Sequence, residues 1–386
     1  MSRKNLPDTG SAVSHSSNVE LSSQPKQTVK RRSFLKGLGV VGAAVSVGSL
    51  LPTEANAAGG DIITVGDVAI LRFVCAAEII ETDIWQQYNE LGGIQDRELP
   101  GGSGSPRYTR AIQKLDGDMP QYIHDNTEDE LTHEQFLNAY LISKGAEPVN
   151  LDQFRTLPSS KATGAQQIGR LTNLMQLTVD TTWWTRYRSR TGNPDLGDTF
   201  PPAIADLATG QHTAIPRTDD DLADKNFLQA IANTAGFHFG TIEQGGTSMY
   251  PRFAQNASSL QTLRILLSIG GTEVMHFQTW SDKAGNAPPL TAVDPVTGVS
   301  VTFPDLNNPP FGGEDFQTNL IMPEPTAFLN RKLPACSIIR PTNPNGTGRA
   351  VVQSLTAAGL FIGQSKDFFD FMTTLAKEAD LATREC

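Results

Sequence analysis

The segment TEVMHFQTW, residues 272–280, carries Glu273 and His276 three positions apart inside an otherwise apolar helical pattern. Leu266 lies seven residues before Glu273 and Trp280 lies seven residues after it. Residues seven apart share nearly the same face of a helix, so the carboxylate should point into a protein core. A buried carboxylate is costly unless it is paired, hydrogen-bonded or bound to a metal ion.

The same glutamate–histidine spacing occurs upstream, between Glu130 and His133. Two further glutamates, Glu78 and Glu243, stand alone in helical patterns, each seven residues before an aromatic residue. The chain therefore presents a lone glutamate, a Glu-x-x-His pair, a lone glutamate and a second Glu-x-x-His pair. A glutamate and a histidine three residues apart share a helix face, so both side chains can reach one centre.

Four helices should carry these residues, over about 67–91, 120–144, 226–254 and 259–283. Packed around one axis, they would bring together four carboxylates and two imidazoles, the ligand set for two divalent metal ions bridged by carboxylates. Without metal, the crowded carboxylates should have raised pKa values. Two alternatives stay open. A single Glu-x-x-His pair is common on a solvated helix surface, and Thr127-x-x-Glu130 is also the pattern of a capping box.

This order of residues resembles the ferritin-like di-iron carboxylate superfamily, and it is most similar to the secreted, desiccation-related ferritin-like family. The first-helix motif L-E-x-L-E-A-x-F-Y resembles residues 77–85, and the second-helix motif D-E-x-x-H matches residues 129–133. The third-helix motif E-D-x-G-x-x-x-Y is matched loosely by residues 243–250, and the fourth-helix motif E-x-x-H is matched by residues 273–276. The chain departs from the family pattern at Trp85, Thr272 and Gln244.

The resemblance implies two bound iron or manganese ions, and carboxylate-rich sites with two histidines suit these metals better than soft ones. The implied metal ligands are Glu78, Glu130, His133, Glu243, Glu273 and His276. The implied residues around these ligands are Asp129, Trp85, Tyr250 and Glu81. Asp129 is a candidate partner for a ligating imidazole. Glu81 is the alternative to Glu78, which is preferred because the family ligand precedes an aromatic residue by seven positions. The other histidines, His124, His212 and His238, have no such context and are expected to be ordinary residues.

The resemblance implies an all-α fold: a ferritin-like four-helix bundle over residues 58–284, interrupted by a long crossover insertion at 146–223. A helix is expected within this insertion, over residues 164–190. The segment 285–386 should form a mixed irregular and helical C-terminal extension on the bundle. Strand-like runs such as 299–303 and a helical stretch over 348–382 are expected within it.

The N-terminal segment predicts export. Residues 30–36, KRRSFLK, form a twin-arginine pattern, a weakly apolar run follows at 37–51, and Ala55-Asn56-Ala57 offers a cleavage site. We therefore interpret residues 1–57 as a removable Tat signal with a polar lead. The alternative is a membrane anchor, but the run falls short of the roughly 20 apolar residues that a spanning helix needs. No later run in the sequence is long and apolar enough to span a bilayer.

The net charge and the cysteine spacing argue against two classes of protein, nucleic-acid-binding proteins and zinc-finger proteins. The 386 residues carry a formal net charge of −10, which disfavours nucleic-acid binding. The three cysteines have no CxxC spacing, so no zinc motif is readable. Cys75 sits in an apolar helical pattern and should be a buried small hydrophobe. If any disulfide forms, Cys336 and Cys386 are the expected pair.

Three classes of function remain open. The first is a periplasmic or extracellular oxidoreductase, such as a ferroxidase, a peroxidase or a manganese catalase-like enzyme, which would act on oxygen or peroxide. The second is a metal-binding protein without turnover, and the third is a stress-protective structural protein. The expected partners are metal ions, oxygen or peroxide and the Tat machinery. An oligomer is compatible with the sequence, but a ferritin storage cage is disfavoured by the long insertion and the C-terminal extension.

Overall fold

The computed structural model describes residues 63–99, 101–189, 197–308, 323–324, 332, 334, 336–337 and 347–385. Within these ranges the chain is mostly helical and adds two short antiparallel two-stranded sheets. The expected signal segment and Cys386 lie outside the described residues, and so does the suggested pairing of Cys336 with Cys386. Cys75 is a free, buried thiol.

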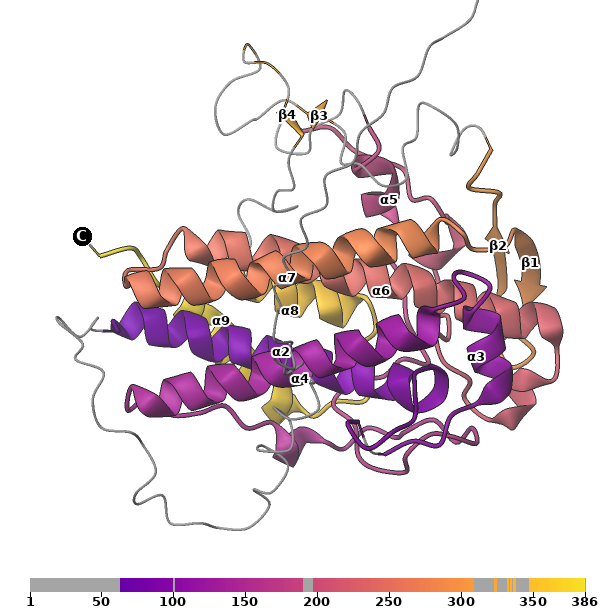
Figure 1. The fold of residues 1–386 in the computed structure, drawn as a ribbon, viewed down its shortest axis with the longest axis horizontal. Coiled ribbons are helices and arrows are strands. Elements are labelled where there is room, and N and C mark those ends of the chain that lie inside the picture. Colours follow the sequence, from indigo (N-terminus) through magenta and orange to yellow (C-terminus); the bar gives the residue numbers. More distant parts are fainter. Residues whose placement is uncertain are drawn as a thin grey trace, which may run out of the picture. The chain divides into compact units, whose positions relative to one another are not determined.

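Four long helices carry the residues singled out in the sequence (Figure 1). They are α2 (Val65–Gly92), α4 (Met119–Ser143), α6 (Lys225–Ala254) and α7 (Leu260–Ala284). Helix α2 packs along α4, and α6 packs along α7. Each helix begins and ends within two residues of the range expected from the sequence.

Side-chain caps define the starts of α2 and α7. Thr64 Oγ1 accepts a hydrogen bond from the backbone N–H of Asp67, and the Asp67 carboxylate accepts one from the backbone N–H of Thr64. The same carboxylate accepts the backbone N–H groups of Ser258 and Ser259 at 2.8 and 2.9 Å. Ser259 is the N-cap of α7. One buried aspartate therefore joins the beginnings of two helices that are distant in sequence.

Thr127 does not cap a helix. It lies well inside α4, which begins at Met119, and its hydroxyl donates to the carbonyl of Ile123 at 2.6 Å. The capping-box alternative for Thr127 and Glu130 is therefore wrong. Glu130 lies in the middle of a continuous helix, where its side chain is free to point into the interior.

Helix α6 runs unbroken through its glycines and through Pro251 to Ala254. Three of its four glycines, Gly236, Gly240 and Gly246, occupy positions where neighbouring side chains come close. A Cβ at Gly240 would lie 2.6 Å from the Trp183 ring. Tertiary packing therefore outweighs the low helix propensity of these residues.

The crossover between α4 and α6 differs from the expectation. The helix expected over residues 164–190 is confined to α5 (Thr182–Arg186), and short 3-10 turns occupy Asp152–Phe154, Asp206–Ala208 and Asp219–Leu222. Side chains of α2 bind the backbone here instead: Asp83 Oδ2 accepts the N–H groups of Leu171 and Thr172 at 3.1 and 3.0 Å. Hydrogen bonds to a helix that is distant in sequence thus replace the backbone hydrogen bonds that a local helix would have formed.

Smaller elements complete the fold. Helix α3 (Pro106–Ile112) lies in the connection between α2 and α4. After α7, β1 (Leu290–Val293) pairs with β2 (Ser300–Phe303), and β3 (Pro323–Glu324) pairs with β4 (Cys336–Ser337). Helices α8 (Gly348–Ala357) and α9 (Lys366–Asp380) follow, and α9 packs on α2 (Figure 1). The small sheets qualify the all-α prediction without changing the helical character of the chain.

Candidate metal centre

Four glutamates and two histidines meet where α2, α4, α6 and α7 face one another. Their ligand atoms form two groups, and within each group these atoms lie within 4.8 Å of one another. The glutamates are fully buried, and the two histidine side chains are 10–11% exposed. The residues concerned are Glu78, Glu130, His133, Glu243, Glu273 and His276.

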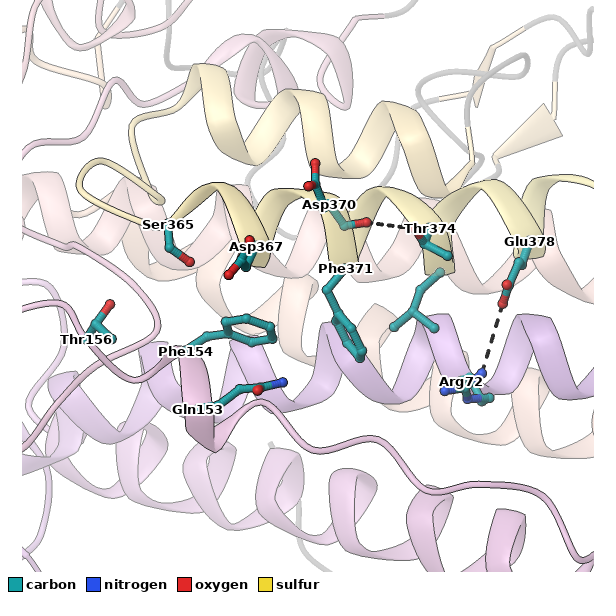
Figure 2. Close-up of a pocket in the computed structure, with 11 residues that line it drawn as sticks. Arg72, Gln153, Phe154, Thr156, Ser365, Asp367, Asp370, Phe371, Thr374 and Glu378 are labelled. Carbon is teal, nitrogen blue, oxygen red and sulfur yellow. Dashed lines mark hydrogen bonds and ion pairs between the residues drawn. The ribbon is translucent and has the colours of Figure 1, made fainter.

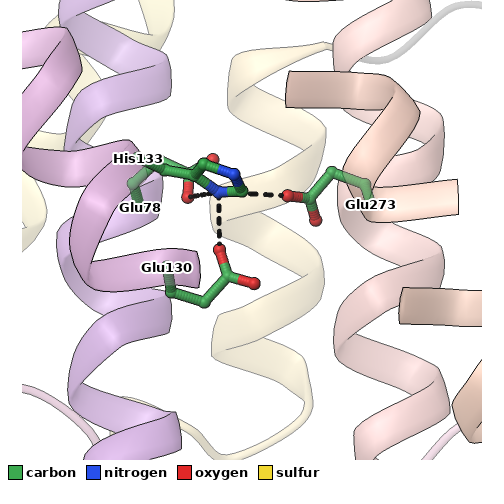
Figure 3. A group of neighbouring side chains, drawn as sticks. All are labelled: Glu78, Glu130, His133 and Glu273. Atoms are coloured by element: carbon green, nitrogen blue, oxygen red, sulfur yellow. Dashed lines mark hydrogen bonds and ion pairs between the residues drawn. The ribbon is translucent and has the colours of Figure 1, made fainter. Parts of the chain in front are cut away.

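The first group surrounds the imidazole of His133 (Figure 3). Its Nδ1 lies 3.0 Å from Glu130 Oε2, 3.3 Å from Glu78 Oε2 and 3.6 Å from Glu273 Oε1. The three carboxylates come from α2, α4 and α7. A single ring nitrogen therefore faces three carboxylates across a small space.

The second group surrounds His276. Its Nδ1 lies 3.0 Å from Glu130 Oε1 and 3.2 Å from Glu243 Oε2, and Glu273 also belongs to the group. Glu130 and Glu273 are thus common to both groups. Glu130 points one oxygen at each imidazole and so links the two groups.

Several buried polar atoms of this cluster form no hydrogen bond. Both carboxylate oxygens of Glu273 are in this state, as are one oxygen each of Glu78 and Glu243 and Nδ1 of His276. The His276 nitrogen lies near carboxylate oxygens but not in hydrogen-bond geometry with them. Buried polar groups are almost always satisfied, and side chains grouped in this way could hold metal ions.

Asp129 and Asn126 hold three of the cluster side chains in place. Asp129 Oδ2 lies 3.2 Å from His276 Nε2, on the side of the ring away from the cluster. Asn126 Nδ2 donates to Glu130 Oε1 at 2.8 Å and to Glu243 Oε1 at 3.1 Å. Sequence reasoning missed Asn126, although it lies four residues before Glu130 and therefore on the same helix face.

Aromatic residues contact the cluster and the residues that support it. The hydroxyl of Tyr250 donates to Glu78 Oε1. Trp280 Nε1 donates to Asn126 Oδ1 at 2.7 Å, and its ring stacks on Trp85 with centroids 5.1 Å apart. Trp85 and Trp280 are almost fully buried, so Asn126, which holds two of the carboxylates, is itself supported by a buried aromatic pair.

Glu81 is also buried but belongs to neither group. One of its carboxylate oxygens has no hydrogen-bond partner. Burial raises the pKa of Glu81 well above the usual carboxyl range, with a further contribution from the charges of Glu130 and Glu243. The structure thus places Glu78 among the grouped ligand atoms and Glu81 beside them.

Gly246 leaves room for Glu273. A Cβ at position 246 would lie 2.2 Å from Glu273 Oε2. Any larger residue would displace that carboxylate. The glycine therefore helps to define the space in which Glu273 faces the other ligands.

Without bound ions, the carboxyl groups of the cluster differ in their pKa values. Burial raises the pKa of Glu78 to about 7 and also raises the pKa values of Glu243 and Glu273. Burial alone would likewise raise the pKa of Glu130, but the two neighbouring imidazoles outweigh it and lower that pKa to about 2. The expectation of four raised carboxyl pKa values is therefore wrong for Glu130, which lies between both rings.

The neighbouring carboxylates raise the pKa values of both imidazoles. Burial alone would lower the pKa of His133, but the carboxylates of Glu130 and Glu78 raise it to about 10. The pKa of His276 is raised well above its usual value, against the effect of burial, chiefly by the charge of Glu243. The neighbouring carboxylates therefore favour the protonated form of both rings, and a cation that binds Nδ1 would compete with a proton there.

The remaining histidines of the described chain have other surroundings. His238 Nδ1 lies 2.6 Å from the Tyr88 hydroxyl, and burial lowers the pKa of His238 to about 3. His212 Nε2 contacts backbone carbonyls. These two are structural, as expected. His124 is buried beside Asp96, which the sequence did not indicate.

A groove of about 610 Å³ lies between α9, α2 and the start of the crossover (Figure 2). Its lining includes Arg72, Phe154, Phe371 and Glu378, and Arg72 lies 4.0 Å from Glu378. None of the six clustered residues lines this groove. The carboxylate–imidazole cluster is therefore a separate, interior feature.

Comparison with known proteins identifies the N-terminal segment. Residues 28–48 match the twin-arginine translocation pathway signal sequence. No curated protein and no solved structure matches the chain. Among the described residues, no helix combines the length and apolar character needed to cross a membrane. The Tat prediction is confirmed, and the protein is exported to the periplasm or the extracellular space.

Proposed function

We propose that this exported protein is a ferritin-like four-helix-bundle protein that holds two iron or manganese ions and uses them in oxygen- or peroxide-linked redox chemistry. The observation that carries the proposal is Glu273. This carboxylate is fully buried, belongs to both ligand groups and has no hydrogen-bond partner for either oxygen. A cation on each side would satisfy both oxygens.

The two ligand groups provide one position for each ion. Glu78 and His133 would hold the first ion, Glu243 and His276 would hold the second, and Glu130 and Glu273 would be shared. Four ionised carboxylates carry four negative charges, which two divalent cations would cancel. Oxygen-rich sites with two imidazoles are typical of iron and manganese, which favours these metals over copper.

Bound ions of this kind would supply electrons to oxygen or peroxide. The chain's own contribution is to present its ligands in the correct form. If Nε2 of His276 carries the proton and donates it to Asp129, the lone pair of Nδ1 faces the carboxylates. Tyr250 holds Glu78 through one oxygen and leaves the other directed toward His133.

The cluster is nearest to solvent on the side of its two histidines. The side chains of His133 and His276 are 11% and 10% exposed, and that of Asp129 is 49% exposed. This partial exposure supports access to the centre for oxygen or peroxide from the histidine side.

Elemental analysis of the purified mature protein tests the proposal. We expect two iron or manganese ions per chain beyond any bound at the surface, and their loss in Glu273→Gln. The matched control is Glu147→Gln, which removes a carboxylate whose side chain is 88% exposed. Equal metal content in wild type and Glu273→Gln would contradict the proposal and favour a stress-protective structural protein.

Redox turnover is tested separately on protein that contains the metal. Oxygen or peroxide consumption should depend on the bound ions and disappear in Glu273→Gln. Metal binding without such consumption would indicate the alternative, a metal-binding protein without turnover. Metal should also stabilise the fold, by about 2.7 kcal/mol at a hundredfold excess over Kd.

A further inference from the structure

A second group of side chains that could hold a metal ion lies nearer the surface, on the N-terminal half of α4. The connection that follows α2 returns over this helix and places Asp96 against His124. Asp96 Oδ1 lies 3.2 Å from His124 Nε2 and also accepts the backbone N–H of Glu98 at 2.8 Å. The anchored carboxylate is an acceptor, so Nε2 of the ring carries a proton and donates it.

The other ring nitrogen then lacks a partner. His124 is 97% buried, since only 3% of its surface is exposed, and its Nδ1 forms no hydrogen bond. It faces Asp125 Oδ1 at 3.6 Å and Glu128 Oε2 at 3.9 Å. The second oxygen of Glu128 is also buried and forms no hydrogen bond. A lone pair that faces two carboxylates is unfavourable unless a cation lies between them.

The distances between these ligand atoms fit a bound metal ion better than a hydrogen bond from a protonated Nδ1. The ligand atoms of His124, Asp125 and Glu128 lie within 4.8 Å of one another. Two ligands each about 2.1 Å from one ion are separated by roughly 3 to 4 Å. A protonated Nδ1 would draw a carboxylate oxygen to about 2.8 Å, which neither oxygen approaches.

We propose that His124, Asp125 and Glu128 bind one divalent first-row transition-metal ion, with Asp96 as the residue that positions the imidazole. Water would complete the coordination, because the side chains of Asp125 and Glu128 are 41% and 18% exposed. Gln121 donates a hydrogen bond at 2.6 Å to Asp125 Oδ1, the same oxygen that faces His124 Nδ1, and this bond holds the carboxylate in place. A carboxylate oxygen has two lone pairs, so Oδ1 can accept this bond and still face the ion. The site is separate from the buried cluster and does not depend on it.

Zn²⁺ is the probe for this site, used with the mature, full-length protein. After equilibrium dialysis, wild type should retain one more ion per chain than Glu128→Gln or Asp125→Asn. Asp118→Asn is the charge-matched control, because this exposed residue lies at the start of the same helix and makes no side-chain cap. It should retain as many ions as wild type. Equal retention by wild type, Glu128→Gln and Asp125→Asn would overturn the proposal.

The two metal proposals are separated by repeating the dialysis in a Glu273→Gln background. The ion that depends on Glu128 should persist there, even if the buried cluster binds nothing. Nitrogen-15 NMR of the histidine rings gives a second measurement. Zn²⁺ should shift Nδ1 of His124 and leave its Nε2 protonated. A shift of Nε2 instead, or no shift at either nitrogen, would contradict the site.

Discussion

Asp129 lies between the buried cluster and solvent, and it contacts the outer nitrogen of His276. Its side chain is half-exposed, so its removal should leave the fold intact. We predict that Asp129→Ala weakens metal binding by the buried cluster about 10- to 100-fold, as loss of a carboxylate partner of a ligating imidazole typically does. Competition with a chelator of known affinity measures the change. Unchanged affinity would show that Asp129 does not position His276.

His238 provides a pH-dependent prediction at a residue that is not among the proposed metal ligands. Its pKa is lowered from 6.5 to about 3 by burial. Between these values the unfolded chain binds a proton that the folded chain does not, so folding stability falls as pH falls through this window. Relative to His238→Gln, the metal-free wild-type protein should lose up to about 1.4 kcal/mol of unfolding free energy per pH unit. Urea denaturation at pH 6 and pH 4 gives this difference, and parallel pH profiles would contradict the assignment.

Gly270 is one of the glycines that allow helices α6 and α7 to pack closely. A Cβ at Gly270 would lie 2.7 Å from Tyr250 Cβ, whereas a Cβ at the adjacent Gly271 would have no neighbour within 4 Å. We predict that Gly270→Ala lowers the unfolding free energy by about 1–3 kcal/mol, because the helices must move apart. Gly271→Ala is the control and should be neutral or stabilising by up to about 1 kcal/mol. Similar effects of both substitutions in chemical denaturation would count against close packing at Gly270.

The long helices were predictable because their buried positions recur with helical spacing. The same spacing placed Glu78 and Glu273 on inward faces, since a carboxylate a heptad from Trp85 or Trp280 shares the direction of that ring. The hydrogen bond that Asp67 accepts from the backbone N–H of Ser258, just before α7, was not predictable, because it joins residues far apart in the chain. Such contacts depend on tertiary packing and leave no local pattern.

The crossover was predicted less well for the same reason. Residues 164–190 have helical periodicity, but the N–H groups of Leu171 and Thr172 bind Asp83 of α2. The buried pair of Arg170 and Glu90 fixes the path further, with Arg170 Nη2 2.6 Å from Glu90 Oε1. Periodicity in a single segment does not reveal that a distant helix offers these acceptors. The group around His124 was missed likewise, because Asp96 reaches it from another segment.

At the scale of the whole molecule, the twin-arginine signal determines where the protein acts. We predict that Arg31→Lys combined with Arg32→Lys retains the protein in the cytoplasm, because the export machinery reads the arginine pair. Cell fractionation followed by immunodetection measures the distribution. Lys30→Gln outside the pair is the control and should still be exported. Unchanged export of the double variant would show that another feature of the chain directs it.

The most direct test of the central claim is anomalous diffraction from crystals of the mature protein loaded with Fe(II) or Mn(II), recorded at the absorption edge of the metal. The proposed centre predicts two peaks inside the cluster, one beside Glu78 and His133 and the other beside Glu243 and His276. Both should contact Glu273. A fully loaded crystal with no peak among these residues would contradict a dinuclear centre.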